Sequence, residues 1–362
     1  MKTLLKTFLV MGALGGFAPS PALAAYDRDY VGQTETYRAK YEDTLVHLAK
    51  EHDIGFVEMR AANPNLDPWM PGEGAVVVLP KKHILPDAPR TGMVINLPEM
   101  RLYYYESPGA KPQTYALGVG REGLDTPLGV TTIVRKRVGP TWTPTERMRR
   151  EDPSLKPFYP AGPDNPMGTH ALYLGWPTYA IHGTDKPYSV GRRASSGCIR
   201  LYPDQIKDLF PRVPVGTQVR VIDQPVKVGW IDGDLYIEVH PTQEQNLRIE
   251  DIGNLSSYEI TREDIRAINK KAGGLKEHID WEAVREAVRA HKGVPVKILD
   301  KDKKPAAARQ QPPVKDAAVK DDAPPAKVEQ AVMTPDESRP APQAVPVKAD
   351  RPARSGNFNL NN

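Results

Sequence analysis

A series of short apolar and aromatic segments between about residues 91 and 221 constrains the fold more than any other feature of the sequence. Residues 93–97 and 101–105 combine β-branched and aromatic side chains on either side of a Pro-Glu turn, which is typical of a β-hairpin. Further segments of this kind, separated by turns that contain Gly or Pro, follow at residues 114–119, 129–134, 171–174, 178–182 and 217–221. This spacing predicts an all-β sandwich or barrel, with a short helix at residues 204–210.

A long segment at residues 139–168 interrupts this series. It is rich in proline and charge and contains Trp142, Arg147, Arg149 and Arg150. A loop of this length inside a compact domain is often a lid over a functional site. A lid and an ordinary surface insertion are both consistent with the sequence.

Residues 30–82 form a separate pattern of strand, helix, helix and strand. Thr44 precedes an apolar helical spacing that includes Leu45 and Leu48, an Asn-Pro turn follows at residues 63–64, and residues 76–79 are an apolar strand before a proline. This pattern resembles a LysM module, a small α+β family that binds N-acetylglucosamine chains such as the glycan of peptidoglycan. The resemblance implies a peptidoglycan-binding module at residues 30–82; an unrelated α+β domain is the alternative.

The first 24 residues have the pattern of a secretory signal peptide. Lys2 and Lys6 precede an apolar run at residues 8–17, and small residues up to Ala24 form a cleavage site. The apolar run is too short to span a bilayer, and no later stretch is apolar enough to do so. We therefore expect an exported protein that does not span the membrane.

The C-terminal part divides into two sections. Residues 224–300 contain a hairpin at residues 226–240 and amphipathic helices that start near Thr261 and Asp280, which we expect to pack on the β domain. Residues 301–362 are rich in Ala, Pro, Lys and Asp, and this composition predicts a disordered tail. The net charge of +4 is too small to indicate a nucleic-acid partner.

The sequence contains one cysteine, Cys198, which cannot form an internal disulfide. A lone cysteine is most often a small buried hydrophobe, but Cys198 has polar neighbours in Ser195 and Ser196. Fifteen residues separate it from His182, which ends a predicted strand. A loop that leaves this strand and returns beside it would bring the thiol within reach of an imidazole base.

Residues around the cysteine suit a nucleophile. Arg192, Arg193 and Arg200 lie close in sequence, and their charges are expected to favour the thiolate. Gly197 permits a sharp turn that points backbone N–H groups at a developing oxyanion. The sequence therefore predicts a thiol active site centred on Cys198.

These two segments resemble the signature of YkuD-type L,D-transpeptidases, in which His-Gly is followed after about fifteen residues by a Ser-His-Gly-Cys-apolar-Asn motif. The present sequence has Ser196 and Arg200 where many members have His and Asn, and in this it is similar to the Gram-negative ErfK/YbiS branch. Residues 125–129, 162–168 and 229–240 are also similar to that branch. The resemblance implies a mainly β, YkuD-like catalytic domain with short helices at residues 90–223, in a periplasmic protein.

The resemblance also implies a mechanism. Cys198 would attack the diaminopimelate–D-Ala bond of a peptidoglycan stem, with His182 as its base and the Gly183 carbonyl orienting the imidazole. The N–H groups around Gly197 and Cys198 would hold the oxyanion. From charge and position we expect Arg200, Arg192 or Arg193 to bind a substrate carboxylate. The acyl acceptor would be an amine, either in a second stem, giving a 3-3 crosslink, or on a lysine of an outer-membrane lipoprotein. The alternatives are hydrolysis, as in an L,D-carboxypeptidase, and a wall-binding protein without catalysis.

The remaining histidines lack the spacing of a metal site. His47, His52, His83, His278 and His291 are expected at the surface, and His170 and His240 are weaker candidates for the site. We therefore expect neither a metal nor an organic cofactor.

Overall fold

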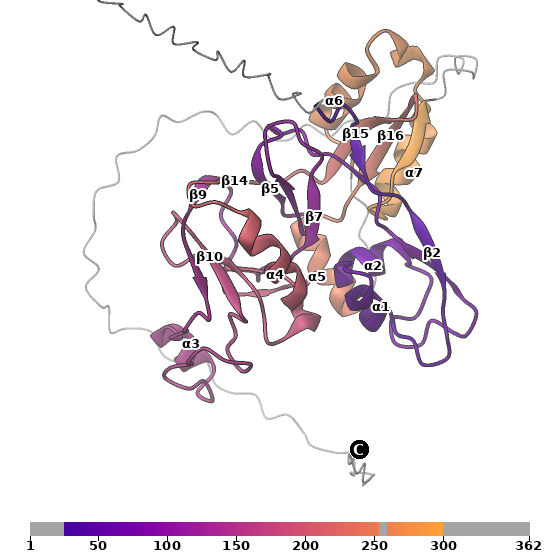
Figure 1. The fold of residues 1–362 in the computed structure, drawn as a ribbon. Coiled ribbons are helices and arrows are strands. Elements are labelled where there is room, and N and C mark those ends of the chain that lie inside the picture. Colours follow the sequence, from indigo (N-terminus) through magenta and orange to yellow (C-terminus); the bar gives the residue numbers. More distant parts are fainter. Residues whose placement is uncertain (1–24, 253–258, 300–362) are drawn as a thin grey trace, which may run out of the picture. The chain divides into compact units, whose positions relative to one another are not determined.

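The computed structural model describes residues 25–252 and 259–299 (Figure 1). The predicted signal peptide and the predicted disordered tail lie outside these residues. Within the described ranges, none of the helices combines the length and the apolar character needed to cross a membrane.

The N-terminal module has the predicted order of strand, helix, helix and strand. Its elements are β1 (Tyr30–Val31), β2 (Glu35–Arg38), α1 (Leu45–Glu51), α2 (Phe56–Ala62), β3 (Val76–Leu79) and β4 (His83–Ile84). The side chain of Thr44 caps α1, and β2 pairs with β3 in an antiparallel ladder. Leu45, Leu48 and Met59 are fully buried in a small core of this module, so the helical spacing in the sequence marks the face that packs inward.

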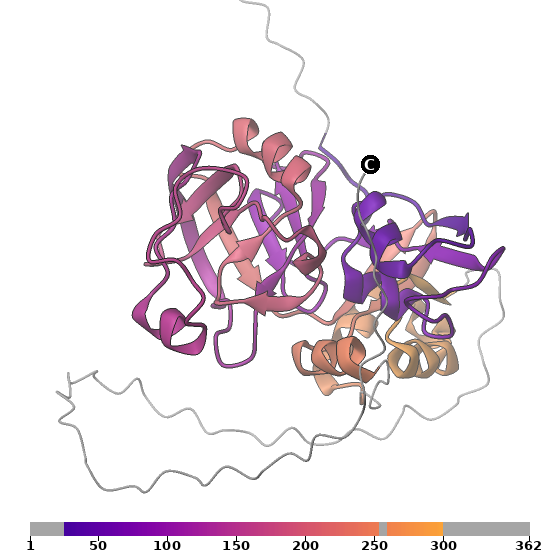
Figure 2. The same ribbon diagram turned by 90° about the horizontal axis from the view of Figure 1, so that it is seen from below.

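An eight-stranded sheet forms the β domain. Its order is β13-β11-β10-β9-β14-β5-β6-β7, with parallel pairing only at β11–β13 and β14–β5. The strands are β5 (Gly92–Asn96), β6 (Arg101–Tyr105), β7 (Gln113–Ala116), β9 (Gly129–Val138), β10 (His170–Leu174), β11 (Ala180–His182), β13 (Ile199–Arg200) and β14 (Gln218–Ile222). The sheet curls into a half-barrel (Figure 2), so the domain is mainly β as predicted but is built on one curled sheet.

Helix α4 (Pro203–Arg212) packs against this sheet. Its first residue, Pro203, suits a helix start because that position needs no N–H donor. Ile206 and Leu209 are fully buried with apolar residues of the sheet such as Leu172 and Ile181. β8 (Val119–Gly120) and β12 (Arg193–Ser195) form a separate two-stranded parallel pair, and a short 3-10 helix occupies Pro187–Ser189.

The C-terminal section differs from the expectation that its helices pack on the β domain. Its elements are β15 (Val226–Ile231), β16 (Asp234–Val239), α5 (Gln243–Ile252), α6 (Arg262–Ala272), a 3-10 helix (Gly273–His278), α7 (Trp281–Ala290) and β17 (Val296–Leu299). The unrecognised strand β17 extends the hairpin to three strands, and α6 and α7 bury their apolar faces on that sheet. Helix α5 instead contacts α2, and its Ile249 joins the core of the β domain.

A cluster of buried charged and polar side chains joins the three sections of the chain. We call it the buried charge cluster; its members are Glu58, His83, Glu99, Arg101, Tyr103, Lys227, Glu238 and His240. The Lys227 ammonium lies 2.9 Å from one carboxylate oxygen of Glu99 and 2.9 Å from one of Glu238. The expectation that His83 lies at the surface is wrong, because its neighbours come from segments far apart in sequence; His291 is also buried.

Candidate active site

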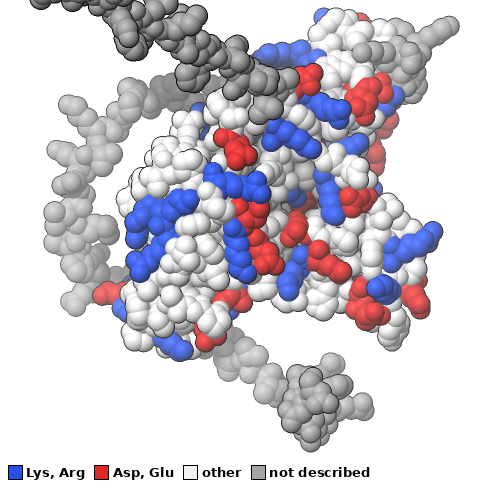
Figure 3. All heavy atoms as spheres, in the orientation of Figure 1, with Lys and Arg blue, Asp and Glu red and all other residues white. Residues whose placement is uncertain are grey.

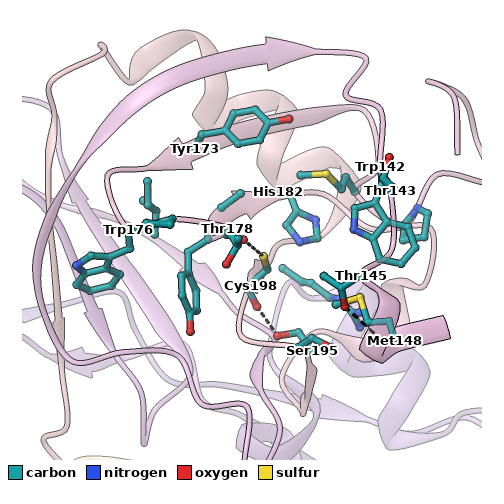
Figure 4. Close-up of a pocket in the computed structure, with 18 of the residues that line it drawn as sticks. Trp142, Thr143, Thr145, Met148, Tyr173, Trp176, Thr178, His182, Ser195 and Cys198 are labelled. Carbon is teal, nitrogen blue, oxygen red and sulfur yellow. Dashed lines mark hydrogen bonds between the residues drawn. The ribbon is translucent and has the colours of Figure 1, made fainter. Parts of the chain in front are cut away.

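The two predicted catalytic residues lie on neighbouring parallel strands. His182 is the last residue of β11, and Cys198 directly precedes β13. The register places Ile181 beside Ile199, so the loop at residues 183–197 leaves one strand and returns beside it. The imidazole of His182 and the sulfur of Cys198 consequently face the same hollow (Figure 4).

The thiol of Cys198 is half-buried rather than part of the hydrophobic core. Its sulfur lies 3.4 Å from the carbonyl oxygen of Thr178, to which the thiol donates. Burial raises the pKa of this thiol, although the backbone of Ala180 and the charge of Arg200 partly oppose the rise. Contrary to the expectation from the neighbouring arginines, the resting site favours the neutral thiol.

The imidazole of His182 is buried and held in one orientation. Its Nδ1 donates to the carbonyl oxygen of Gly183 at 2.5 Å, which leaves Nε2 as the acceptor. Burial, helped by the charge of Arg200, lowers the pKa of His182 to about 4, against the opposing effect of the Gly183 and Met167 carbonyls. The imidazole is therefore neutral at pH 7 and available as a base.

The turn that carries the nucleophile is tightly bonded. Ser195 Oγ donates to the Cys198 carbonyl at 2.5 Å and accepts from the Gly197 N–H at 3.1 Å, while Thr126 Oγ1 donates to the Gly197 carbonyl at 2.8 Å. Gly197 has φ of +105°, and a Cβ there would lie 2.7 Å from the ring of Tyr179. The Gly197 N–H is thus used within the turn, where it donates to Ser195.

A cavity of about 1070 Å³ opens over the thiol. Cys198, His182, Ser195, Ser196 and Arg200 lie on its wall. Figure 4 shows Trp142 and Met148, from the segment at residues 139–168, on one side of the sulfur and Trp176 on the other.

The long segment at residues 139–168 supplies much of the cavity wall, which favours the lid interpretation. It contains the short helix α3 (Glu146–Glu151), capped by Thr145. Trp142 and Tyr159 pair through their backbones and pack their rings 5.3 Å apart. Arg121 reaches Glu151 at 2.5 Å, so an ion pair connects this segment to the rest of the domain.

The cavity wall carries more arginines than acidic residues, of which it has Glu151 and Asp152. Five arginines line it: Arg121, Arg135, Arg137, Arg147 and Arg200. Figure 3 shows Lys and Arg side chains gathered over the part of the sheet that carries β9 and β10. Sequence reasoning missed Arg121, Arg135 and Arg137; the last two alternate along β9, which continues past the strand predicted at residues 129–134. A wall of this charge suits a substrate that carries several carboxylates.

Arg192 and Arg193 do not line the cavity. The Arg192 guanidinium lies 3.8 Å from the centre of the Phe56 ring, and the buried Arg193 pairs with Asp125 and donates to the Gly120 carbonyl. The prediction that these two arginines bind substrate is therefore not supported, since their side chains are used to hold the loop.

Within the described residues, the three side chains whose donor atoms lie close enough to share a metal ion are His83, Glu99 and Glu238. They belong to the buried charge cluster, where the Lys227 ammonium already contacts both carboxylates. This donor set is neutralised by protein cations, so it does not fit a metal ion. His170 contacts the ring of Phe210 outside the cavity wall, and His240 pairs with Glu238 at 2.7 Å.

Comparison with known proteins identifies a family model and similar proteins. The model of the YkuD family, described as the L,D-transpeptidase catalytic domain, matches residues 90–221. The probable L,D-transpeptidase YbiS of Escherichia coli K12 is 39% identical over 313 residues, which cover 82% of this chain and 100% of YbiS. The probable L,D-transpeptidase ErfK/SrfK of the same organism is 46% identical over 224 residues, 60% of this chain and 72% of the relative. The catalytic domain of an E. faecium L,D-transpeptidase, solved by NMR, aligns with a TM-score of 0.30 at 24% identity, covering 38% of this chain and 100% of that domain.

Proposed function

The chain belongs to the YkuD family of peptidoglycan L,D-transpeptidases, close to ErfK, YbiS and YcfS of Escherichia coli, and on this basis we propose that Cys198 is its nucleophile and His182 its general base. The observation that supports these roles is the parallel pairing of β11 with β13, which brings a half-buried thiol and a neutral imidazole to one basic cavity. A neutral pair suits this chemistry, because the imidazole takes the proton as the sulfur attacks.

The first half-reaction cleaves the bond between diaminopimelate and the terminal D-Ala of a stem peptide. Nε2 of His182 takes the thiol proton, and the sulfur of Cys198 adds to the carbonyl carbon. The N–H of Cys198 stabilises the oxyanion, and the protonated His182 returns the proton to the departing D-Ala amine. A thioester to Cys198 remains.

The second half-reaction transfers the acyl group to an amine. The amine attacks the thioester, His182 accepts the amine proton, and its return to sulfur restores the thiol as the new amide forms. The acceptor is either a diaminopimelate side chain, giving a 3-3 crosslink, or a lysine of an outer-membrane lipoprotein. Water in place of the amine would make the same site an L,D-carboxypeptidase or a hydrolase.

One incubation distinguishes these acceptors. The full chain is mixed with tetrapeptide muropeptides, with or without a peptide that ends in lysine, and the products are separated by mass. Release of D-Ala with 3-3 dimers or lysine-linked tripeptides supports transfer, and free tripeptide alone supports hydrolysis. No loss of D-Ala under any condition would contradict the proposed chemistry.

Arg200 is proposed to bind a carboxylate of the donor stem, because it lines the cavity beside Cys198 and lies opposite His182 in the strand register. Changing Arg200→Ala is expected to raise KM roughly 10-fold and to lower kcat less, since the lost contact acts mainly in binding. Steady-state kinetics of D-Ala release measure both constants. Arg150→Ala, an exposed change outside the cavity wall, is the control; an unchanged KM in Arg200→Ala would refute the role.

The N-terminal module is proposed to bind peptidoglycan glycan. Its two loops expose large apolar side chains, with Tyr41 86%, Trp69 62% and Met70 77% exposed. The loops are joined by a hydrogen bond from the Leu45 N–H to the Pro68 carbonyl at 2.9 Å. Exposed aromatic side chains on adjoining loops offer flat apolar faces on which sugar rings stack.

Removing those faces tests glycan binding. The double variant Tyr41→Ala and Trp69→Ala is expected to weaken co-sedimentation with purified sacculi roughly 10-fold or more. D-Ala release from soluble muropeptides should stay near the wild-type rate. Val215→Ala, a change at an exposed apolar residue of the β domain, is the control. Equal sedimentation of all three proteins would rule out this surface.

The signal-peptide pattern and the proposed substrate together support export to the periplasm. Fractionation of cells that express the full chain would test this proposal. Retention of an uncleaved chain in the cytoplasm would contradict it.

A further inference from the structure

The loop between the two catalytic residues contacts the N-terminal module at residues 54–57, and its Tyr188 ring also lies beside His47 and Lys50 of α1. The N–H of Val57 donates to the Gly191 carbonyl at 3.1 Å. The guanidinium of Arg192 lies over the ring of Phe56, 3.8 Å from its centre. The module therefore holds the chain shortly before the nucleophile.

The same stretch also holds the chain after the nucleophile. The hydroxyl of Tyr202 donates to the Ile54 carbonyl at 2.9 Å, and both residues are buried. Gly191 and Arg192 precede Cys198 in the sequence, and Tyr202 follows it. Residues 54–57 thus contact the chain both before and after the nucleophile.

A short series of hydrogen bonds connects these contacts to the turn that carries the thiol. The carbonyl of Arg192 accepts from the Val119 N–H at 3.0 Å, and β12 then pairs with β8 as far as Ser195. Ser195 bonds both Gly197 and Cys198 through its hydroxyl. A displacement at Gly191 would therefore reach the nucleophile turn through a short bonded path.

The contact itself is close, and the module side is fixed. Gly191 has φ of +76°, and a Cβ there would lie 2.1 Å from the Phe56 backbone nitrogen. Glu58 accepts from the Gly55 N–H at 3.3 Å and pairs with Arg101 of the β domain at 2.5 Å. Helix α2 is thereby anchored at its first turn, beside the residues that touch the loop.

We propose that residues 54–57 of the N-terminal module are positioning residues for the thiol, so that the module is part of the active-site structure as well as a wall-binding element. This inference rests on the proposed roles of Cys198 and His182. It follows from the contacts that residues 54–57 make with the chain on both sides of Cys198. Misplacement of a reacting atom by about 1 Å costs up to roughly 100-fold in rate, so weakening these contacts should lower kcat measurably.

Two matched pairs of variants in the full chain test the proposal. Tyr202→Phe removes only the hydroxyl bonded to Ile54, and its control is Tyr104→Phe, whose hydroxyl donates to the Arg212 carbonyl at 2.7 Å. Gly191→Ala drives a Cβ into the module, and its control is Gly216→Ala, which has φ of +91° but no atom within 4 Å of a Cβ. Tyr104→Phe likewise removes a hydroxyl that donates to a backbone carbonyl, and Gly216→Ala likewise places a side chain at positive φ; neither residue is part of the contact with residues 54–57.

Three quantities are measured: the rate of acylation of Cys198 by a carbapenem, the rate of its alkylation by iodoacetamide, and the separate values of kcat and KM for D-Ala release. Tyr202→Phe is expected to slow acylation about 10-fold and Gly191→Ala about 100-fold, with kcat reduced and KM nearly unchanged. Alkylation should become faster in both, since a loosened turn exposes the sulfur. Neither control should change these rates.

Wild-type acylation and alkylation rates in Tyr202→Phe and Gly191→Ala would overturn the positioning role. If Gly191→Ala does not fold, Tyr202→Phe alone decides the question. A wild-type protein that a carbapenem fails to acylate would instead refute the proposed catalytic roles, and iodoacetamide would still report on the turn. The two failures are therefore distinguishable.

Discussion

Changing Cys198→Ser is expected to lower D-Ala release by at least roughly 1000-fold, because a hydroxyl is a far weaker acid than a thiol and is harder to activate as a nucleophile. The pKa of His182, lowered to about 4, makes this imidazole a weak base, so it suits a thiol far better than a hydroxyl. The measurement is release of D-Ala from tetrapeptide muropeptides. Mass spectrometry should also show one carbapenem adduct in the wild-type chain and none in the variant.

The histidine gives an independent check on the same pair. His182→Asn should lose most of the turnover, and the double variant should lose little more, because two groups that act as one unit have non-additive effects. His170→Asn, on the neighbouring strand and outside the cavity wall, is the control and should retain activity. Full additivity of the two losses, or an active His182→Asn enzyme, would mean that the two side chains do not act together.

The parts of the site that the sequence predicted depend on local patterns. His182 ends a short strand, and a glycine and a polar turn precede Cys198, so a returning loop was foreseeable. The helices at α1 and α4 also follow from apolar spacing and from Thr44 or Pro203 at their starts. Such signals lie within a few residues of the feature they predict.

The parts that the sequence did not predict depend on burial and on distant segments. Sequence proximity indicated that Arg192 and Arg193 would favour a thiolate, but the turn directs both away from the cavity, and burial raises the pKa of the thiol. The charged neighbours of His83 come from helix α2, the turn between β5 and β6, and the C-terminal hairpin. A side chain's partners at such separations are set by tertiary packing and leave no local pattern.

The buried charge cluster gives the second large expected effect. Lys227→Met should lower the free energy of unfolding by about 3–5 kcal/mol at pH 7, because the carboxylates of Glu99 and Glu238 stay buried without their cation. Burial is the largest influence and raises the pKa values of both carboxyls, but Lys227, the largest opposing influence, together with His240 and His83 holds the pKa of Glu238 well below its usual range and that of Glu99 below it. Urea unfolding followed by circular dichroism measures the loss.

The pH dependence identifies the cause of that loss. In the wild-type chain the depressed carboxyl pKa values stabilise the fold above the unfolded pKa of about 4.3, and this stability is lost as the pH falls through the folded pKa values. Without Lys227, burial raises the pKa values of these carboxyls, so they become protonated and neutral at a higher pH than in the wild type. The loss of unfolding free energy caused by Lys227→Met should therefore be smaller at pH 5 than at pH 7. Lys81→Met removes a half-exposed pair with Glu35 at 3.0 Å and should cost at most about 1 kcal/mol. A similar loss in both variants, or a Lys227→Met deficit that grows toward pH 5, would show that the buried ammonium does not neutralise these carboxylates.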